Sequence, residues 1–459
     1  MFPFIGRNAN KDHPARRGPL PDHRRLVMAA VVVWLAHTVH GPAVSAEQAD
    51  RPNIVVILAD DVGIDAIGCY GGTSFKTPAI DKLAQSGTRF DHCYSMPVCH
   101  PTRICFLTGR YPRKLQNPKW GSFPRELETQ TVAHTMQRLG YATAVAGKWQ
   151  LSLLKQDPQQ PHRMGFDKYC LFGWHEGARY HDPLLWQNGA LRDGTAGSYG
   201  PDLYVDFLID FFRQHQDQPF FAFYSMALCH DVTDDLKQPV PYVPGKQRYL
   251  NYGEMVQSMD QCVARIVDSL EALGLRKKTW ILFTGDNGTA SRSIARAQRD
   301  PQAKRGWQYV REPVYVNFRG RRVQGGKGRL TDSGTHVPLI VSRPGSLAAG
   351  ATSDALIDFS DFLPTFAALG GQADLPDALD GVSFANLLDG ATQGKRSWAY
   401  SESKSKKYWV RDQRFKLYSN GAIYDLQTDP DETHDLQTQP PAAATQRLAA
   451  LRRALQSLK

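Results

Sequence analysis

Residues 53–61 read NIVVILADD, an unbroken apolar run that ends in two aspartates. A run of this length without polar alternation predicts a strand buried on both faces, as in a parallel sheet covered by helices. A second run, TWILFT at 279–284, leads into Gly285-Asp286-Asn287-Gly288. Because ligands of parallel α/β sheets bind beyond the carboxyl ends of the strands, both polar clusters are candidate site residues.

Further strand and helix patterns alternate with these two runs. Predicted strands lie at 142–146, 219–226 and 337–341, and predicted helices at 77–86, 132–139, 254–273 and 361–369. Alternation of this kind predicts an α/β fold with a mainly parallel, mixed sheet flanked by helices. Residues 289–318 are basic and polar and have no clear period, so we interpret them as a long surface loop.

The sequence changes character from about residue 395. Short β-like runs at 398–402, 408–411, 415–419 and 422–426 are separated by polar turns, and a helical pattern at 445–458 follows. Runs of this length predict a small antiparallel sheet. We therefore expect a catalytic domain at 47–390 and a C-terminal subdomain, an antiparallel sheet plus a helix, at 391–459.

The N-terminal 46 residues have the pattern of a secretory signal peptide. Arg24 and Arg25 precede the apolar stretch LVMAAVVVWLA at 26–36, and small residues at 44–46 follow. Eleven apolar residues are too few to span a bilayer, which takes about 20. We expect a periplasmic or secreted protein with no membrane span in its mature form. An uncleaved anchor and export by a twin-arginine route stay open.

Composition limits the function classes. The 459 residues are 42% hydrophobic and 22% charged, which excludes fibrous and mostly disordered classes. The net charge is +10, or +6 without the first 46 residues, and the sequence has no dense basic stripe with interleaved aromatics. This argues against a nucleic-acid partner and is compatible with anionic small molecules or polysaccharides.

The seven cysteines form no C-x-x-C pair, which argues against a zinc ribbon. An odd number of cysteines in an exported protein leaves at least one of them outside any disulfide within the chain. One or two disulfides among the others are possible. Cys99 precedes Pro101, a residue that suits the first turn of a helix. A thiol at a helix N-terminus is a plausible nucleophile, although a buried structural cysteine fits the same spacing.

The polar clusters offer hard oxygen ligands. Asp60, Asp61, Asp286 and Asn287 provide carboxylate and amide oxygens, which suit Ca²⁺ or Mg²⁺ rather than Zn²⁺. Asp-Asp and Asp-Asn-Gly are also common in turns, so either cluster taken alone has a purely structural interpretation. Two such clusters at two predicted strand ends favour a metal site.

The segment Cys99-x-Pro101-x-Arg103, followed by Leu107-Thr108-Gly109-Arg110, resembles the signature of the formylglycine-dependent (type I) sulfatases of the alkaline-phosphatase-like superfamily. Other segments match this family in order, from about residue 51 to 440. They are residues 52–63, 77–84, 147–149, 284–288, 325–328 and 410–426.

The resemblance implies a specific chemistry. A maturation enzyme would oxidise Cys99 to formylglycine, whose hydrated form, a geminal diol, would attack the sulfur of a sulfate ester and later expel sulfate. The implied metal ligands, for Ca²⁺ or Mg²⁺, are Asp60, Asp61, Cys99, Asp286 and Asn287. The implied catalytic residues are Cys99, Arg103 to orient the diol, Lys148 and Lys327 to neutralise sulfate oxygens, and His230 to protonate the leaving alcohol.

One departure from the family bears on this chemistry. The family's second signature ends in Lys-Trp-His, whereas this chain has Lys148-Trp149-Gln150, and glutamine cannot act as a base. Either another group such as His100 or His92 serves, or turnover is slow, or a metal-bound hydroxide performs the second step.

Three functions remain from the sequence. The first is a sulfatase acting on sulfate monoesters, in particular those of sulfated carbohydrates. The second is a phosphate or phosphonate ester hydrolase on the same fold. The third, favoured only by Gln150, is a catalytically impaired protein that binds sulfated glycans.

Overall fold

The computed structural model describes residues 51–458 apart from 175, 232–250, 303–306, 373–374, 376–377 and 406. The predicted signal peptide at 1–46 lies outside these residues. Among the helices of the described residues, none has the length and apolar character needed to cross a membrane.

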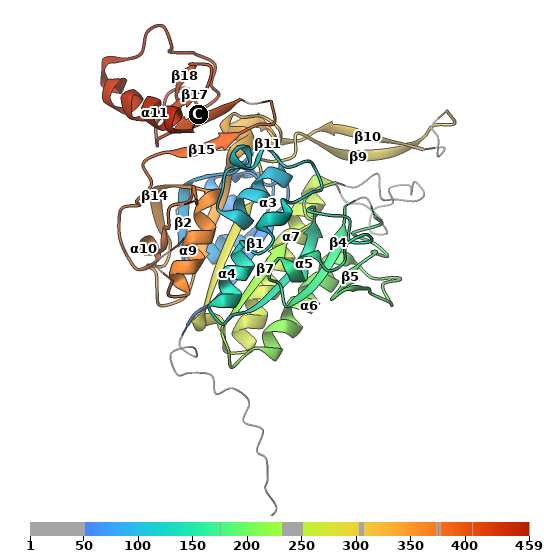
Figure 1. Ribbon diagram of the computed structural model, residues 1–459. Coiled ribbons are helices and arrows are strands. Elements are labelled where there is room, and N and C mark those ends of the chain that lie inside the picture. The colour runs from blue at the N-terminus through green and yellow to red at the C-terminus, as the bar shows by residue number, and fades with distance from the viewer. Residues whose placement is uncertain are drawn as a thin grey trace, which may run out of the picture. The chain divides into compact units, whose positions relative to one another are not determined.

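A ten-stranded sheet forms the centre of the fold (Figure 1). Its order is β14-β2-β13-β8-β1-β7-β3-β4-β5-β6. Strands β8, β1, β7, β3 and β4 run parallel, whereas β13 is antiparallel to both its neighbours, and β5 and β6 add an antiparallel edge. The predicted mixed, mainly parallel sheet is therefore confirmed. The bounds of its strands are β1 Asn53–Ala59, β2 Thr88–Tyr94, β3 Ala142–Trp149, β4 Lys168–Gly173, β5 Trp186–Gln187, β6 Ala190–Leu191, β7 Phe220–Ser225, β8 Thr279–Gly285, β13 His336–Ser342 and β14 Ala351–Asp358.

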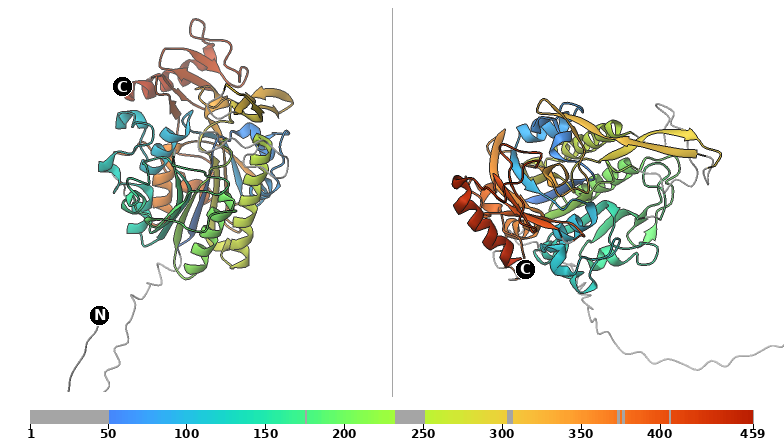
Figure 2. Two further views of the ribbon diagram at one scale, coloured as in Figure 1. Left: turned by 90° about the vertical axis from the view of Figure 1, so that its right-hand side faces the viewer. Right: turned by 90° about the horizontal axis from the view of Figure 1, so that it is seen from above.

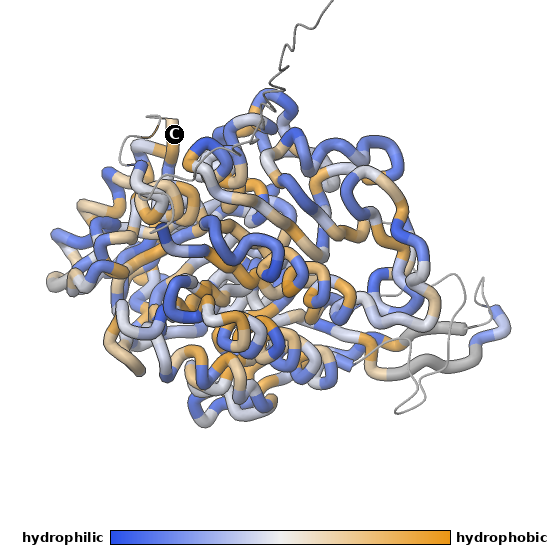
Figure 3. Tube along the Cα trace, turned by 90° about the horizontal axis from the view of Figure 1, so that it is seen from below, coloured by the Kyte–Doolittle hydropathy of each residue, from blue (hydrophilic) through white to orange (hydrophobic). Residues whose placement is uncertain are grey.

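Helices cover both faces of the sheet (Figures 1 and 2). The α-helices of the described residues are α2 Pro78–Gln85, α3 Cys99–Thr108, α4 Val132–Arg138, α5 Gln160–Arg163, α6 Gly200–Gln214, α7 Tyr252–Ala272, α8 Asp332–Thr335, α9 Phe362–Leu369, α10 Ala385–Leu388 and α11 Thr445–Ser457. Figure 3 shows helical turns on which hydrophobic and hydrophilic residues alternate, as expected for helices with one face on a sheet.

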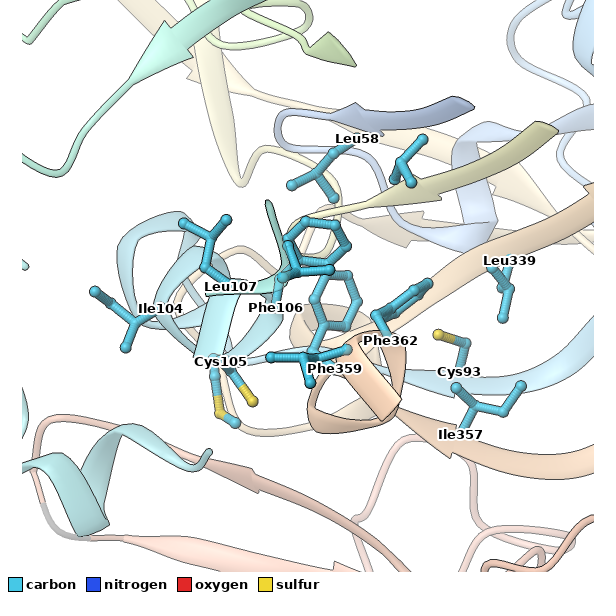
Figure 4. Close-up of a cluster of buried hydrophobic side chains, with 14 of the residues drawn as sticks. Leu58, Cys93, Ile104, Cys105, Phe106, Leu107, Leu339, Ile357, Phe359 and Phe362 are labelled. Carbon is cyan, nitrogen blue, oxygen red and sulfur yellow. The ribbon is translucent and has the colours of Figure 1, made fainter. Parts of the chain in front are cut away.

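Strand β1 shows why an unbroken apolar run was needed. Because successive side chains of a strand point to opposite faces, its even-numbered residues 54, 56 and 58 enter one core, and Val55, Ile57 and Ala59 enter the other. The first core packs β1 against α3, α4 and α9, with Phe106 and Phe362 in ring contact 5.4 Å apart (Figure 4). The second packs it against α2, α6 and α7. Both faces of β1 are therefore fully buried.

The interpretation of residues 289–318 as a loop was wrong. These residues form β9 Arg292–Arg299 and β10 Trp307–Pro313, which pair as an antiparallel hairpin, and β11 Tyr315–Phe318, which pairs with β12 Arg321–Gln324. The β9–β10 hairpin extends away from the sheet (Figures 1 and 2). A two-stranded ribbon can form without regular alternation of apolar and polar residues, and the sequence RSIARAQR of β9 has none, so the usual strand signal is missing.

The C-terminal residues form the expected antiparallel sheet. Its order is β15-β16-β17-β18, and α11 packs on β16 and β17. The bounds are β15 Ala399–Glu402, β16 Tyr408–Arg411, β17 Phe415–Tyr418 and β18 Ile423–Asp425. The boundary at 390/391 between the two predicted domains stays a prediction.

All seven cysteines lie in the part of the chain that the structure describes, and each is a free thiol. The disulfides that the sequence left open are therefore absent from this structure. Because none of the seven cysteines is paired, their odd number does not single out one of them. Cys99 differs from the other six by its position in the fold.

Candidate active site

The carboxyl ends of β1 and β8 bring the two acidic segments together. The register pairs Ala59 with Gly285, so Asp60-Asp61 and Asp286-Asn287 leave the sheet side by side. The backbone N–H of Asp61 donates to Asp286 Oδ1 at 3.2 Å, and Asn287 Nδ2 donates to Asp61 Oδ1 at 2.9 Å. Asp61 adopts a left-handed backbone conformation with φ of 62°, which lets consecutive carboxylates turn into one cluster.

Helix α3 delivers Cys99 to this cluster. Cys99 is the first residue of α3, as the position of Pro101 predicted, and it is fully buried. Thr102 Oγ1 donates to the carbonyl of Val98 at 3.1 Å and so fixes the helix start. Cys99 Sγ and carboxylate oxygens of Asp60 and Asp286 all lie within 4.8 Å of one another. Burial raises the pKa of the Cys99 thiol, so the unmodified side chain is a neutral thiol and a poor nucleophile.

Three cationic side chains face the three carboxylates. Lys148 Nζ donates to Asp60 Oδ2 at 2.5 Å, and Lys327 Nζ donates to Asp61 Oδ2 at 2.7 Å. Arg103, one helical turn beyond Cys99, donates from Nε and Nη2 to Asp286 Oδ2 at 3.1 and 2.7 Å. The predicted residues from β1, α3, β3, β8 and the 325–328 segment therefore meet at one place.

Burial and neighbouring charges shift the pKa values of the carboxyl groups in the cluster in different directions. Burial alone would raise the pKa of Asp60, but Lys148, His230, Arg103 and Lys327 together hold that pKa well below its usual range. For Asp61, burial raises the pKa to about 7; Lys327 opposes this, and the charges of Asp60 and Asp286 reinforce it. Carboxylates that lie this close together repel one another, and an added positive charge stabilises their ionised forms.

The oxygen donors fit a divalent cation. Asp60 Oδ1 and Asn287 Oδ1 are buried and have no hydrogen-bond partner among the described residues. A buried oxygen without a partner costs free energy unless something else occupies its lone pairs. The donor set is made of carboxylate and amide oxygens, as hard divalent cations prefer. The predicted ligands thus suit Ca²⁺ or Mg²⁺.

His230 lies close enough to the cluster for its charge to lower the pKa of Asp60, and within the described part of the chain no hydrogen bond joins it to the cluster. It follows β7, is half-buried, and its Nδ1 lies 2.7 Å from the carbonyl of Asp231, so that Nδ1 carries the proton and Nε2 faces elsewhere. Burial and then Lys327 lower the pKa of His230 well below its usual value. His230 is therefore neutral before an anion binds.

The sequence reasoning missed three residues of the site. Trp174 stacks edge-on against His230 at 5.7 Å, and its ring lies 5.2 Å from Lys148 Nζ and 5.1 Å from the Arg179 guanidinium. Ser225 accepts from Arg103 and donates to the carbonyl of Lys148 at 2.7 Å. Trp174 and Arg179 follow β4 in a segment without a motif; Ser225 ends β7, where a strand-end polar residue was a usable signal.

The substitution at Gln150 leaves an uncommon arrangement. Gln150 is fully buried, and neither its amide oxygen nor its amide nitrogen has a hydrogen-bond partner among the described residues. His100 directs Nε2 at the carbonyl of Ser122 at 2.8 Å, and burial lowers its pKa to about 4. His92 stacks on His336 and lines a different cavity. Of the two histidines, only His100 adjoins Cys99.

The C-terminal sheet holds the segment that carries Lys327. Trp409 Nε1 donates to the carbonyl of Leu330 at 2.7 Å, and Asp332 accepts from Arg411 at 2.7 Å and from Lys416 at 2.5 Å. Arg411 and Lys416 are buried, so loss of the Asp332 carboxylate would leave two buried charges short of a partner. The small C-terminal sheet therefore positions the segment of Lys327, whose ammonium group contacts Asp61.

Comparisons with known proteins agree with this geometry. The family model for Sulfatase matches residues 52–372, and the model for the C-terminal part of N-sulphoglucosamine sulphohydrolase matches residues 327–459. The chain belongs to the sulfatase family, within the alkaline-phosphatase-like superfamily, and is therefore a sulfuric ester hydrolase.

Curated relatives cover most of the chain. Arylsulfatase A of Homo sapiens is 28% identical over 481 residues, covering 89% of this chain and 87% of that protein. N-acetylgalactosamine-6-O-sulfatase of Bacteroides thetaiotaomicron is 26% identical over 483 residues, covering 86% and 91%. The two relatives are named for different sulfate esters, so the names agree on the type of reaction but not on the substrate.

Solved structures share the fold at lower identity. A protein solved in complex with its substrate D-glucosamine-2-N,6-O-disulfate superposes with a TM-score of 0.67 at 22% identity, covering 89% of this chain and 97% of that chain. The phosphonate monoester hydrolase of Agrobacterium radiobacter superposes with a TM-score of 0.58 at 20% identity, covering 88% and 96%. At these identities the likeness concerns the fold alone.

Proposed function

We propose that this protein is a secreted sulfatase that hydrolyses sulfate monoesters of carbohydrates, with formylglycine derived from Cys99 and a bound divalent cation, Ca²⁺ or Mg²⁺. The observation that supports this best is the meeting of Cys99 with three buried carboxylates and three buried or half-buried cations at the carboxyl ends of the sheet strands. The cation would be held by Asp60, Asp61, Asp286, Asn287 and the modified residue 99.

The charges of the cluster suit a sulfate monoanion. The carboxylates of Asp60, Asp61 and Asp286 are balanced by Lys148, Lys327 and Arg103, so that a divalent cation would leave the site positive. A positive, water-poor site stabilises the anionic oxygens of a sulfate ester more strongly than water does. When bound, the cation and the hydrated aldehyde of formylglycine supply an acidic hydroxyl nucleophile.

The side chains of the site then have separate roles in the reaction. Arg103 is fixed by Asp286 and Ser225 and orients residue 99. Lys148 and Lys327 exchange their carboxylate partners for sulfate oxygens, a role worth about 3 kcal/mol each by analogy with an oxyanion donor. His230 is neutral in the free protein, and the charge of a bound sulfate would raise its pKa toward a value useful for protonating the leaving alcohol.

Export and maturation belong to the same proposal. The signal-like residues 1–46 would direct the chain to the periplasm or beyond the cell, and a formylglycine-generating enzyme would act on the Cys99 segment. Relatives named for sulfated sugars, such as N-acetylgalactosamine-6-O-sulfatase, support a carbohydrate substrate.

The test is a comparison of sulfate esters with phosphate esters. We expect the matured protein to hydrolyse sulfated mono- or oligosaccharides at least about 100-fold faster, in kcat/KM, than the corresponding phosphate and phosphonate esters. The reason is that the cluster offers oxygen ligands for one cation, and the described residues include no second, histidine-rich ligand set. Release of sulfate and phosphate would be measured by ion chromatography, with metal content by elemental analysis. Faster phosphate release, with two bound metal ions, would establish the hydrolase alternative instead.

Substitution of Gln150 by histidine tests the role of the missing base. Because Gln150 is buried with both amide atoms unpartnered, a histidine of similar size can be placed there, and a general base contributes about 10²–10⁴-fold. We expect Gln150→His to raise kcat about tenfold and to give log kcat a limb that falls with decreasing pH below about 6.5. Gln150→Asn is the control for altered packing. An unchanged pH profile would mean that another group already serves as base.

A further inference from the structure

A large cavity lies outside the proposed catalytic cluster, which consists of Asp60, Asp61, Cys99, Arg103, Lys148, Asp286 and Lys327. It has a volume of about 1010 Å³ and is bounded by the β11–β12 hairpin, the C-terminal sheet and the segment after Lys327. None of the residues of the catalytic cluster lines it. The segment 326–334 forms a shared wall, because Lys327 contacts Asp61 on one side while Arg329, Thr331 and Ser333 line the cavity on the other.

The lining of this cavity is strongly basic. Seven arginines and three aspartates line it. Two of the aspartates are already neutralised, Asp332 by Arg411 and Asp431 by Arg321. The third, Asp65, is buried and accepts a hydrogen bond from Thr289 at 2.5 Å, so it is one negative charge against the remaining arginines. The cavity therefore has an excess of positive charge.

Three of the arginines have no carboxylate partner. Arg319, Arg322 and Arg329 are exposed and contact no acidic side chain in the part of the chain that the structure describes. Arg319 and Arg322 stack on the rings of Phe318 and Tyr315, at 4.8 and 4.1 Å from the centroids. Stacking orients both guanidinium planes. Arg319 donates from Nε to the carbonyl of Tyr70 at 3.3 Å, whereas its Nη groups and the N–H groups of Arg322 have no hydrogen-bond partner among the described residues, an arrangement suited to binding sulfate oxygens.

The remaining lining suits sugar rings. Gln324, Gln413 and Gln427 offer amide groups, and Thr331 and Ser333 offer hydroxyls that can pair with sugar hydroxyls. The half-buried Phe318 adds an apolar surface on which the C–H face of a sugar ring can lie. Guanidinium groups, neutral polar groups and one aromatic ring are together the complement of a sulfated glycan. An isolated inorganic anion would need no cavity of this size.

We propose that this cavity is a second binding site for a sulfated polysaccharide chain, which holds the polymer while one of its sulfate esters enters the catalytic cluster. The inference rests on the proposed function for its substrate class. Binding at two places on one polymer makes the second contact intramolecular and lowers the KM for polymers relative to small esters.

Binding without turnover is the first test. We use the Cys99→Ala protein, a size-defined dextran sulfate oligosaccharide as probe, and unsulfated dextran of the same length as control. We expect Arg322→Ala/Arg329→Ala in this background to bind dextran sulfate about tenfold more weakly and with a shallower salt dependence. Arg213→Ala/Arg452→Ala removes the same charge from exposed positions outside the cavity and should leave affinity unchanged. Equal losses in both double variants, or equal binding of unsulfated dextran, would overturn the second site.

Kinetics of the active protein is the second test. We expect Arg322→Ala/Arg329→Ala to raise KM for a sulfated polymer about tenfold, with unchanged kcat and unchanged turnover of a small aryl sulfate. An equal loss on the small ester would place both arginines in the catalytic pocket and overturn the inference. Because the binding test needs no hydrolysis, it stays decisive even if the protein proves to hydrolyse another ester.

Discussion

Cys99→Ala lowers kcat/KM for a sulfated sugar by at least about 10⁴-fold and leaves the protein folded, because it removes the nucleophile and only one buried sulfur. Cys99→Ser behaves differently. A serine hydroxyl can accept the sulfuryl group once, but it has no second hydroxyl with which to expel sulfate. We therefore expect at most one turnover per molecule, seen as a burst in alcohol release by quenched-flow analysis.

Cys69→Ala is the matched control for this prediction. Cys69 is a half-buried free thiol in the short helical turn Gly68–Tyr70, and its backbone N–H donates to Asp81 Oδ1 at 2.7 Å. Its substitution changes a thiol without touching the cluster, so activity should stay within about twofold of the parent. Full activity of Cys99→Ala would show that the reaction uses a nucleophile elsewhere.

The second large effect is expected for Asp286→Asn, which should lower kcat by about 10³-fold. The substitution removes one negative ligand for the cation and the carboxylate that fixes Arg103 through two donors. Removal of one member of a buried ion pair also leaves Arg103 charged and short of a partner. The measurement is kcat together with the increase in Tm that Ca²⁺ produces, which should be lost in the variant.

Asp65→Asn provides the matched control for Asp286→Asn. Asp65 is another buried aspartate of the β1–α2 connection, and it accepts from Thr289 at 2.5 Å, an interaction that an amide oxygen can retain. Activity and the response to Ca²⁺ should both survive in this variant. If Asp286→Asn kept its response to Ca²⁺ while Asp65→Asn lost it, the cation would be bound elsewhere than proposed.

The parts of the fold that the sequence predicted are those set by local chemistry. The run at 53–59 was predicted as a doubly buried strand because six consecutive apolar side chains, Ile54–Ala59, fit a strand of a parallel sheet covered on both faces. Pro101 fixed the start of α3 and so placed Cys99 at a helix N-terminus. The meeting of Asp60-Asp61 with Asp286-Asn287 followed from parallel strands ending at one edge.

Other parts of the fold and of the site depend on contacts that produce no periodic pattern in the sequence. The residues of β9 read RSIARAQR, in which apolar and polar residues do not alternate regularly, so the strand signal was missing. Trp174 reaches the site from a segment after β4, where nothing in the local sequence distinguishes it from a core residue. The pairing of Asp332 with Arg411 and Lys416 joins residues about 80 positions apart and could be found only in three dimensions.

The most direct test of the proposed chemistry is the mass of the tryptic peptide Phe90–Arg103 from protein matured in a host with a formylglycine-generating enzyme. This peptide holds both Cys93 and Cys99. We predict that after alkylation Cys93 carries the label, whereas residue 99 has exchanged H₂S for oxygen and reacts with a hydrazide probe. An alkylated Cys99 in a preparation that hydrolyses sulfate esters at full rate would contradict the proposal.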